Sequence, residues 1–131
     1  MSKYLIDTNV IIDFWRGKNF FQNFTFGKNT SISTVVLAEL YCGAEKSKNP
    51  SKERKKVEEF IKDFDIEIIS VDSSIAKIYG VLRSRLEKKG VRLEDFDLLI
   101  ASTALQNNMT LVTSNTKHFE RLQDLNILKP V

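Results

Sequence analysis

The amino-acid sequence predicts an α/β domain built on a mainly parallel β-sheet. Short apolar runs of strand length alternate with longer segments in which apolar residues recur at helical spacing, and this alternation is typical of parallel strands joined by helices. The chain has 131 residues, of which 42% are hydrophobic and 28% charged, the balance of an ordinary globular protein. We therefore expect residues 1–131 to form a single domain.

The expected elements follow from these runs and from the residues that begin and end helices. Ser51 is a plausible N-cap after Asn49-Pro50, and Gly90 should end the long helix before it. The expected strands cover residues 3–6, 30–33, 66–71, 110–113 and 126–129, and the expected helices cover residues 10–15, 18–24, 34–47, 52–64, 73–89, 95–107 and 117–123.

Composition also restricts where the protein works. No apolar run approaches the roughly 20 residues that span a bilayer, and the first residues lack a charged leader followed by a long apolar segment. The single cysteine, Cys42, lies in the apolar pattern of residues 34–47, so we expect a buried thiol in a reducing compartment. These features favour a cytoplasmic protein without a membrane segment.

Basic residues are unevenly distributed, although the net charge is only +3. Residues 46–56 hold six basic residues against one acid, and residues 83–92 hold five against one. Two such local surfaces suggest contact with a polyanion. Solvated helix ends are often lysine-rich as well, so the charge alone leaves both interpretations open.

An acid follows the first expected strand. Asp7-Thr8-Asn9 comes directly after Tyr4-Leu5-Ile6 and is followed by another apolar run. A turn also needs polar residues, so this stretch is either a simple loop or a metal ligand held at the end of a sheet.

A second acid lies in an apolar helical stripe. Glu39 has Val35 and Val36 one turn before it and Cys42 one turn after it. An ionised carboxylate on a buried face is costly unless it is paired or bound to a metal. No basic residue lies within one turn on the same helix, although a salt bridge to a lysine elsewhere stays open.

A third acid begins the helix expected at 95–107. Asp97 lies in the first turn, where the helix dipole favours an anion, and one turn before the small Ala101 on the interior side. Asp95 is better placed to cap the helix or to act in an outer shell. We therefore take Asp97 as the functional acid.

Small oxygen-bearing residues also follow the strand at 110–113, as Thr113-Ser114-Asn115. Ligands bind at the carboxyl ends of parallel strands, so Asp7 and this segment would share one crevice if the two strands are neighbours. Three gathered acids would repel one another without a cation, and oxygen ligands select a hard ion, Mg²⁺ or Mn²⁺. The sole histidine, His118, excludes a two-histidine, metal-free ribonuclease.

In this order and spacing, the motifs resemble those of the PIN-domain nucleases, and in size the chain resembles the toxins called VapC. The resemblance extends over essentially the whole chain. It is carried by Asp7-Thr8-Asn9, by Glu39 within Ser33-Thr34-Val35-Val36-Leu37-Ala38-Glu39-Leu40, by Asp97-Leu98-Leu99-Ile100-Ala101, and by Val112-Thr113-Ser114-Asn115 followed by His118-Phe119.

The resemblance implies a three-layer α/β/α sandwich and a metal-dependent endoribonuclease, the toxin of a toxin–antitoxin pair. It implies cleavage by a metal-activated water that leaves a 5′-phosphate and a 3′-hydroxyl, a homodimer, and inhibition by a small antitoxin. Asp7, Glu39 and Asp97 match the catalytic metal ligands, and Thr8 and Asn9 match residues that orient them. The supporting residues on this reading are Thr8, Asn9, Asp95, Thr113, Ser114 and Asn115.

One residue of the site departs from the family's pattern, and other residues near it are candidates for contacts with RNA or for holding the last loop. Asn115 stands where many members of the family have a fourth acid, so we expect one well-held ion and a second recruited only with substrate. Arg83, Arg85 and Arg92 are the candidate RNA contacts, because their stretch leads into the helix that carries Asp97. We expect His118 to hold the last loop through a hydrogen bond.

Five aromatic residues crowd an early segment: Trp15, Phe20, Phe21, Phe24 and Phe26. Their pattern fits packing on the core, an apolar groove for an antitoxin or a second subunit, or a mixture of the two.

Two functions other than a nuclease are compatible with parts of the sequence. A non-catalytic or RNA-processing RNA-binding module on the same fold would explain Asn115 and the basic stretches. A phosphatase with a nucleophilic aspartate at a strand end is disfavoured, because such enzymes carry a second aspartate two residues on, where this chain has Asn9.

Overall fold

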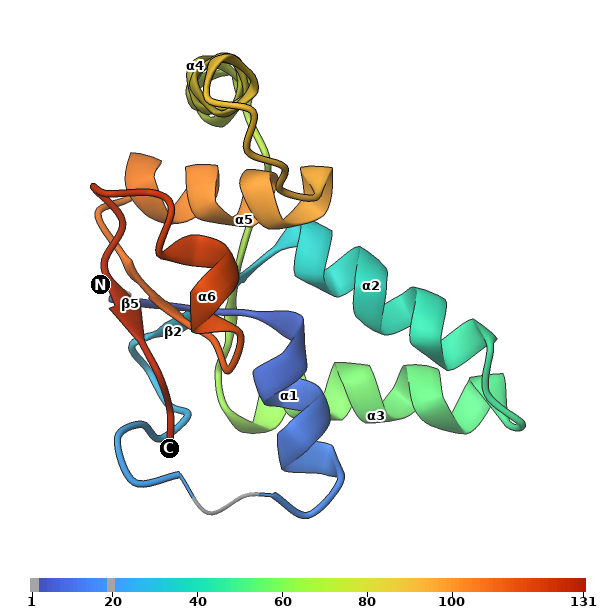
Figure 1. Cartoon of the computed structure of the whole chain (residues 1–131). Helices are drawn as coiled ribbons and strands as arrows, with labels where there is room; N and C mark the ends of the chain where they lie inside the picture. Colours follow the sequence, from blue (N-terminus) through green and yellow to red (C-terminus); the bar gives the residue numbers. More distant parts are fainter. Residues whose placement is uncertain (1–2, 19–20) are drawn as a thin grey trace.

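The computed structural model describes residues 3–18 and 21–131, and a five-stranded parallel sheet forms its centre (Figure 1). The strands follow the order β3-β2-β1-β4-β5, and each pair of neighbours is parallel. Their bounds are β1 Tyr4–Ile6, β2 Thr30–Ser33, β3 Glu67–Ile69, β4 Thr110–Val112 and β5 Ile127–Leu128. The expected parallel sheet is confirmed, and the first strand pairs with the one at 110–113, which meets the condition for a shared crevice.

Helices cover both sides of this sheet. Figure 1 shows α5 lying along the sheet with α4 stacked outside it, and α1 and α3 on the other side. Helices α2 and α3 pack against each other, as do α4 and α5. The helices are α1 Thr8–Trp15, α2 Thr34–Glu45, α3 Pro50–Asp63, α4 Ser73–Lys88, α5 Asp95–Gln106 and α6 Thr116–Phe119. No helix within residues 3–18 and 21–131 combines the length and the hydrophobicity that a membrane crossing requires.

The core lies between the central strands and the helices. Leu5, Ile32 and Leu111, from three adjacent strands, are fully buried, as are Leu98 and Ile100 of α5. Burial of the central strands on both faces is typical of parallel sheets and fits the apolar runs of β1 and β4, whereas β2 is mostly polar in sequence yet equally buried.

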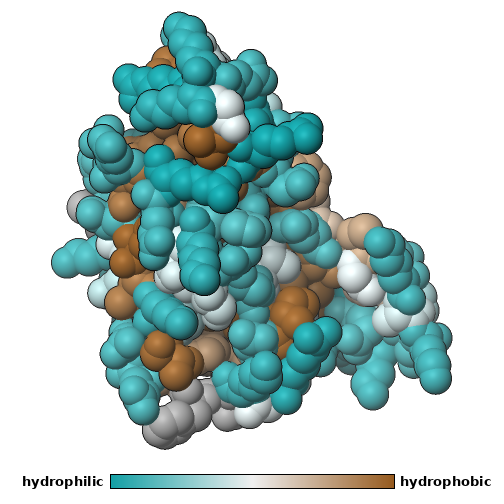
Figure 2. Space-filling model, in the orientation of Figure 1, coloured by the Kyte–Doolittle hydropathy of each residue, from teal (hydrophilic) through white to brown (hydrophobic). Residues whose placement is uncertain are grey.

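A cluster of aromatic rings closes one side of the core. Phe60 of α3 contacts Trp15 and Phe26, with ring centroids 5.7 Å and 5.1 Å apart, and Phe26 also contacts Phe21 and Phe24. The described rings of the early segment therefore pack inward, and Figure 2 shows a mainly hydrophilic face with small, separate hydrophobic patches. Phe20 lies outside the described residues.

Three expectations about helix position, burial and capping away from the site are wrong. The helix expected at 18–24 is absent from residues 18 and 21–24, and residues 19 and 20 lie outside the described chain; Asn23 instead bonds the carbonyl groups of Pro130 and Lys129. Cys42 is exposed, because the buried stripe of α2 runs through Leu40 and Ala44. Asn49, not Ser51, caps α3, and Pro50 occupies the first helical position.

Candidate active site

The register of the two central strands places Asp7 beside Thr113. Ile6 pairs with Val112, and the Asp7 N–H donates to the Val112 carbonyl at 2.9 Å. The two strands end at the same edge of the sheet, where β1 leads into α1 and β4 leads into the loop before α6. Asp7 also caps α1, since its carboxylate accepts from the Thr8 N–H at 2.9 Å.

The Asp7 carboxylate is buried, with 5% of the residue exposed. Its other oxygen, Oδ2, accepts from the Thr113 hydroxyl at 2.8 Å and from the Asn9 amide at 3.2 Å. Burial raises the pKa of Asp7 to about 6, with smaller contributions from the charges of Asp97 and Glu39 and against the hydrogen bonds from Thr113 and Thr8. Asp97 and Glu39 therefore lie close enough to Asp7 for their charges to act on it.

Thr8 and Asn9 link Asp7 to the surrounding elements. The Thr8 hydroxyl donates to Glu39 Oε1 at 2.6 Å, which ties the partly buried Glu39 of α2 to the start of α1. The Asn9 amide oxygen accepts from the Ser114 N–H at 3.2 Å. These bonds fix the two strand-end segments relative to each other.

Asp97 approaches the same region from the first turn of α5. Its Oδ2 lies 3.5 Å from Nδ1 of His118, and its side chain is 24% exposed. Burial raises the pKa of Asp97 above its ordinary value, although the hydrogen bond to His118 opposes the shift. His118 also lies 2.9 Å from the Asn115 amide nitrogen, and the Asn115 N–H donates to the Thr113 hydroxyl at 3.0 Å.

The donor chemistry of this region fits a hard divalent cation, but the ligands are not preassembled. Within residues 3–18 and 21–131, no three histidine, cysteine, aspartate or glutamate side chains form a ready-made metal site. Glu39 is engaged by Thr8 and Asp97 faces His118. A cation would offset the cost of burying the Asp7 charge and the repulsion from Asp97 and Glu39, which together raise the pKa of Asp7, and carboxylate oxygens suit Mg²⁺ or Mn²⁺.

Asp95 belongs to a different group of contacts. The expected cap at Asp95 is wrong, because the N-cap position of α5 is Glu94 and Asp95 is the first helical residue. Asp95 Oδ1 accepts from the Tyr79 hydroxyl at 2.7 Å and from the Arg83 guanidinium at 2.6 Å. These two donors hold the pKa of Asp95 below its ordinary value.

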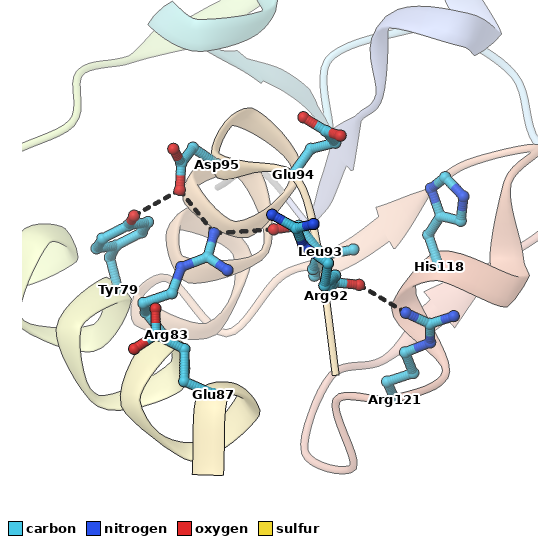
Figure 3. Close-up of a pocket in the computed structure, with 9 residues that line it drawn as sticks. All are labelled: Tyr79, Arg83, Glu87, Arg92, Leu93, Glu94, Asp95, His118 and Arg121. Carbon is cyan, nitrogen blue, oxygen red and sulfur yellow. Dashed lines mark hydrogen bonds and ion pairs between the residues drawn. The ribbon is translucent and has the colours of Figure 1, made fainter. Parts of the chain in front are cut away.

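A cleft of about 760 Å³ opens beside this group, between α4, the loop before α5, and α6 (Figure 3). Arg92 lines it, whereas Arg85 lines a separate hollow with Leu82 and Asp124. In Figure 3, Arg121 and His118 approach from the wall opposite Arg83. The side chains that line the cleft are the basic Arg83, Arg92 and Arg121, the acidic Glu87, Glu94 and Asp95, and Tyr79, Leu93 and His118.

Sequence reasoning missed two residues of this region. Arg121 donates to the Arg92 carbonyl at 2.6 Å and so joins the loop before α5 to the segment after α6. Tyr79 lies one turn before Arg83 on α4, a spacing that puts both on one face of a helix. That spacing is a weak signal, because nothing local indicates which element the face meets.

Comparisons with known proteins agree with this geometry. A family model described as "PIN domain" matches residues 4–125. Ribonuclease VapC2 of Rickettsia felis is 38% identical over 128 residues, which cover 93% of this chain and 93% of that protein. The tRNA(fMet)-specific endonuclease VapC of Salmonella typhimurium is 35% identical over 130 residues, which cover 97% of each.

Solved structures show the same fold. The DNA-bound VapBC structure from Salmonella typhimurium matches with a TM-score of 0.83 at 30% identity, over 98% of both chains. VapBC-1 from nontypeable Haemophilus influenzae matches with a TM-score of 0.81 at 28% identity, over 96% of both chains. The chain belongs to the PIN-domain family and, within it, to the VapC ribonucleases.

Proposed function

We propose that this ribonuclease hydrolyses RNA phosphodiesters with Asp7, Glu39 and Asp97 as its acidic site and Mg²⁺ or Mn²⁺ as its cofactor. The observation that carries the proposal is the Asp7 carboxylate, buried at a strand end and within reach of the charges of the other two acids. PIN-domain nucleases depend on metal ions in general, and carboxylate oxygens as ligands favour a hard ion.

The chain's own residues would orient the site. Thr113 and the Thr8 N–H hold the two oxygens of Asp7, and the Thr8 hydroxyl holds Glu39. Asn9 would keep the strand-end loops in register through Ser114. When bound, the ion would lower the pKa of a water and neutralise charge on the phosphate. The water oxygen bonds to phosphorus as the P–O3′ bond breaks, which leaves a 5′-phosphate and a 3′-hydroxyl.

Asn115 supports a single tightly held ion. Its amide contacts His118, and it adds no negative charge where many members of the family have a fourth acid. A second ion would then enter only with the phosphates of the substrate, since an amide oxygen binds a divalent cation more weakly than a carboxylate does.

The proposed substrate and partners are based on the descriptions of related proteins. Two of them are described as tRNA(fMet)-specific endonucleases, so a tRNA is the first substrate to test. Several matched structures are complexes with an antitoxin, and we propose that this chain is the toxin of such a pair and forms a homodimer. We also propose that residues 1–131 act as one domain in the cytoplasm, where RNA is available.

Arg92 lies in the cleft beside α5 and is a candidate RNA contact.

The direct test is cleavage of purified initiator tRNA by the purified protein with Mg²⁺, with Mn²⁺ and with EDTA. Cleavage should require the metal and should be lost in Asp7→Asn and in Asp97→Asn. The matched control is Asp63→Asn, which removes a carboxylate from the exposed end of α3. Cleavage that continues in EDTA or in Asp7→Asn would contradict the proposal.

The alternative is an RNA-binding module that does not cleave, favoured by Asn115. It predicts RNA affinity that falls steeply with salt and is unchanged in the acid-to-amide variants. A filter-binding titration of the same proteins at two salt concentrations separates the two functions.

A further inference from the structure

The helix that carries Asp97 begins differently from the other long helices. Within the described residues, α1, α2, α3 and α4 each start with a side chain that accepts from a backbone N–H of the first turn. At the N-cap position of α5, Glu94 makes no such hydrogen bond. A helix without a cap frays more readily at its first turn, and Asp97 lies in that turn.

Side chains of α4 hold this helix start instead. The Arg83 guanidinium donates to Asp95 Oδ1 at 2.6 Å and to the Leu93 carbonyl at 2.8 Å, one contact on each side of the N-cap residue. The Tyr79 hydroxyl donates to the same Asp95 oxygen at 2.7 Å. Figure 3 shows both side chains converging on Asp95 from one face of α4.

The geometry restrains Arg83 strongly. Its side chain is only 21% exposed, and its guanidinium lies 5.7 Å from the centroid of the Tyr79 ring. One nitrogen, Nη2, donates both of these hydrogen bonds. The planar guanidinium also lies over the Tyr79 ring, which gives it a better defined orientation than the flexible ammonium of a lysine would have.

We propose that Tyr79, Arg83 and Asp95 form a latch that positions Asp97 for metal binding. The inference rests on the proposed function, in which Asp97 is a ligand. The latch residues touch neither ion nor RNA; they act through the first turn of α5. Arg83 is thereby a positioning residue, a different role from the RNA contact that its place in a basic stretch suggests.

Metal affinity measured without RNA separates the latch from the other roles open to Arg83. An RNA contact would leave Mn²⁺ affinity unchanged when no RNA is present. Simple electrostatics would make Arg83→Gln bind Mn²⁺ more tightly, because a nearby positive charge is gone. The latch predicts weaker binding, because an ordered Asp97 is lost. Mn²⁺ affinity in Arg83→Gln should therefore be unchanged if Arg83 contacts RNA, rise if Arg83 acts only through its charge, and fall if Arg83 belongs to the latch.

The experiment is a calorimetric Mn²⁺ titration of the full chain, wild type and variants, together with kcat and KM for tRNA cleavage. Loss of outer-shell support typically costs about 10- to 100-fold in metal affinity or activity. We expect about a 10-fold weaker Kd for Mn²⁺ in Arg83→Gln and in Asp95→Asn, a smaller loss in Tyr79→Phe, and a fall in kcat larger than the change in KM.

Two comparisons sharpen the result. Lys77→Gln removes a positive charge from an exposed position of the same helix and should leave Mn²⁺ affinity unchanged within 2-fold or slightly raised. The double variant Arg83→Gln/Asp95→Asn should lose less than the sum of the two single losses, because both changes break the contact between Arg83 and Asp95. Thermal unfolding monitored by circular dichroism identifies any variant that has lost its fold, and Tyr79→Phe keeps the ring and its packing.

Mn²⁺ affinity that rises or stays constant in Arg83→Gln overturns the latch, and so does fully additive loss in the double variant. A folded Tyr79→Phe with wild-type Mn²⁺ affinity and kcat also overturns it. If the wild type itself neither binds Mn²⁺ nor cleaves tRNA, the proposed function fails and the latch fails with it. Wild-type cleavage alongside unaffected variants rejects the latch alone.

Discussion

Replacing Asp7 with asparagine should stabilise the metal-free protein at neutral pH while abolishing its nuclease activity. The carboxylate is buried, and burial together with the charges of Asp97 and Glu39 disfavours its ionised form. Asparagine has nearly the same shape and no charge. The substitution therefore removes a cost that the fold carries whenever no cation is bound.

The magnitude follows from the pKa of Asp7, which rises from 3.8 to about 6 on folding. A pKa difference of 1 corresponds to about 1.36 kcal/mol, so ionised Asp7 costs about 3 kcal/mol. Below pH 3.8 the group is protonated in both states and contributes nothing. Between pH 3.8 and about 6 the folded state holds the proton more tightly, so stability falls as pH rises and then levels off.

The assay is urea unfolding in EDTA at several pH values from 4 to 7, followed by the fluorescence of Trp15, which packs against Phe60. At pH 4 the difference between Asp7→Asn and the wild type mainly reflects the hydrogen bonds from Thr113 and Asn9, which the amide satisfies only in part. From pH 4 to pH 7 the difference should move in favour of the variant by about 2.4 kcal/mol, since Asp7 of the unfolded chain is already partly ionised at pH 4.

Metal ions should oppose this difference in stability. At a concentration of Mn²⁺ about 100 times its Kd, the wild type gains about 2.7 kcal/mol and the variant, which lacks a ligand, gains little. A difference in unfolding free energy that is flat between pH 4 and pH 7 would refute the reasoning. So would equal stabilisation of both proteins by Mn²⁺.

Three further predictions address other parts of the molecule. Phe60→Ala should lower the unfolding free energy by about 3–5 kcal/mol in urea titrations, because it removes the ring that joins the aromatic cluster; a loss under 1 kcal/mol would contradict that packing. Thr8→Val should cut kcat about 10-fold with little change in melting temperature, since it frees Glu39; unchanged kcat would show that Glu39 needs no such support. Asn115→Asp should tighten Mn²⁺ binding in calorimetry, because it adds a carboxylate beside His118, and weaker binding would place the ion elsewhere.

Much of the fold was predictable because it depends on local patterns. Apolar runs marked β1 and β4, and Gly90, whose φ of +69° is one that glycine adopts easily, marks the end of α4. The polar residues after these two strands would share an edge only if the strands were neighbours, and the pairing of Ile6 with Val112 meets that condition. Two wrong predictions were also local: Cys42 lies just off the buried stripe of α2, and Asn23 bonds the end of the chain where a helical turn was expected.

The sequence alone determined which acids are unusual, because a carboxylate in an apolar run or after a buried strand is visible in the order of residues. Only the tertiary structure decided their partners: Thr8 for Glu39, His118 for Asp97, and Tyr79 with Arg83 for Asp95. The physical reason is range. Helix and strand preferences depend on neighbours a few residues away, whereas a hydrogen bond between α4 and α5 depends on how two helices pack on a sheet that neither of them specifies alone.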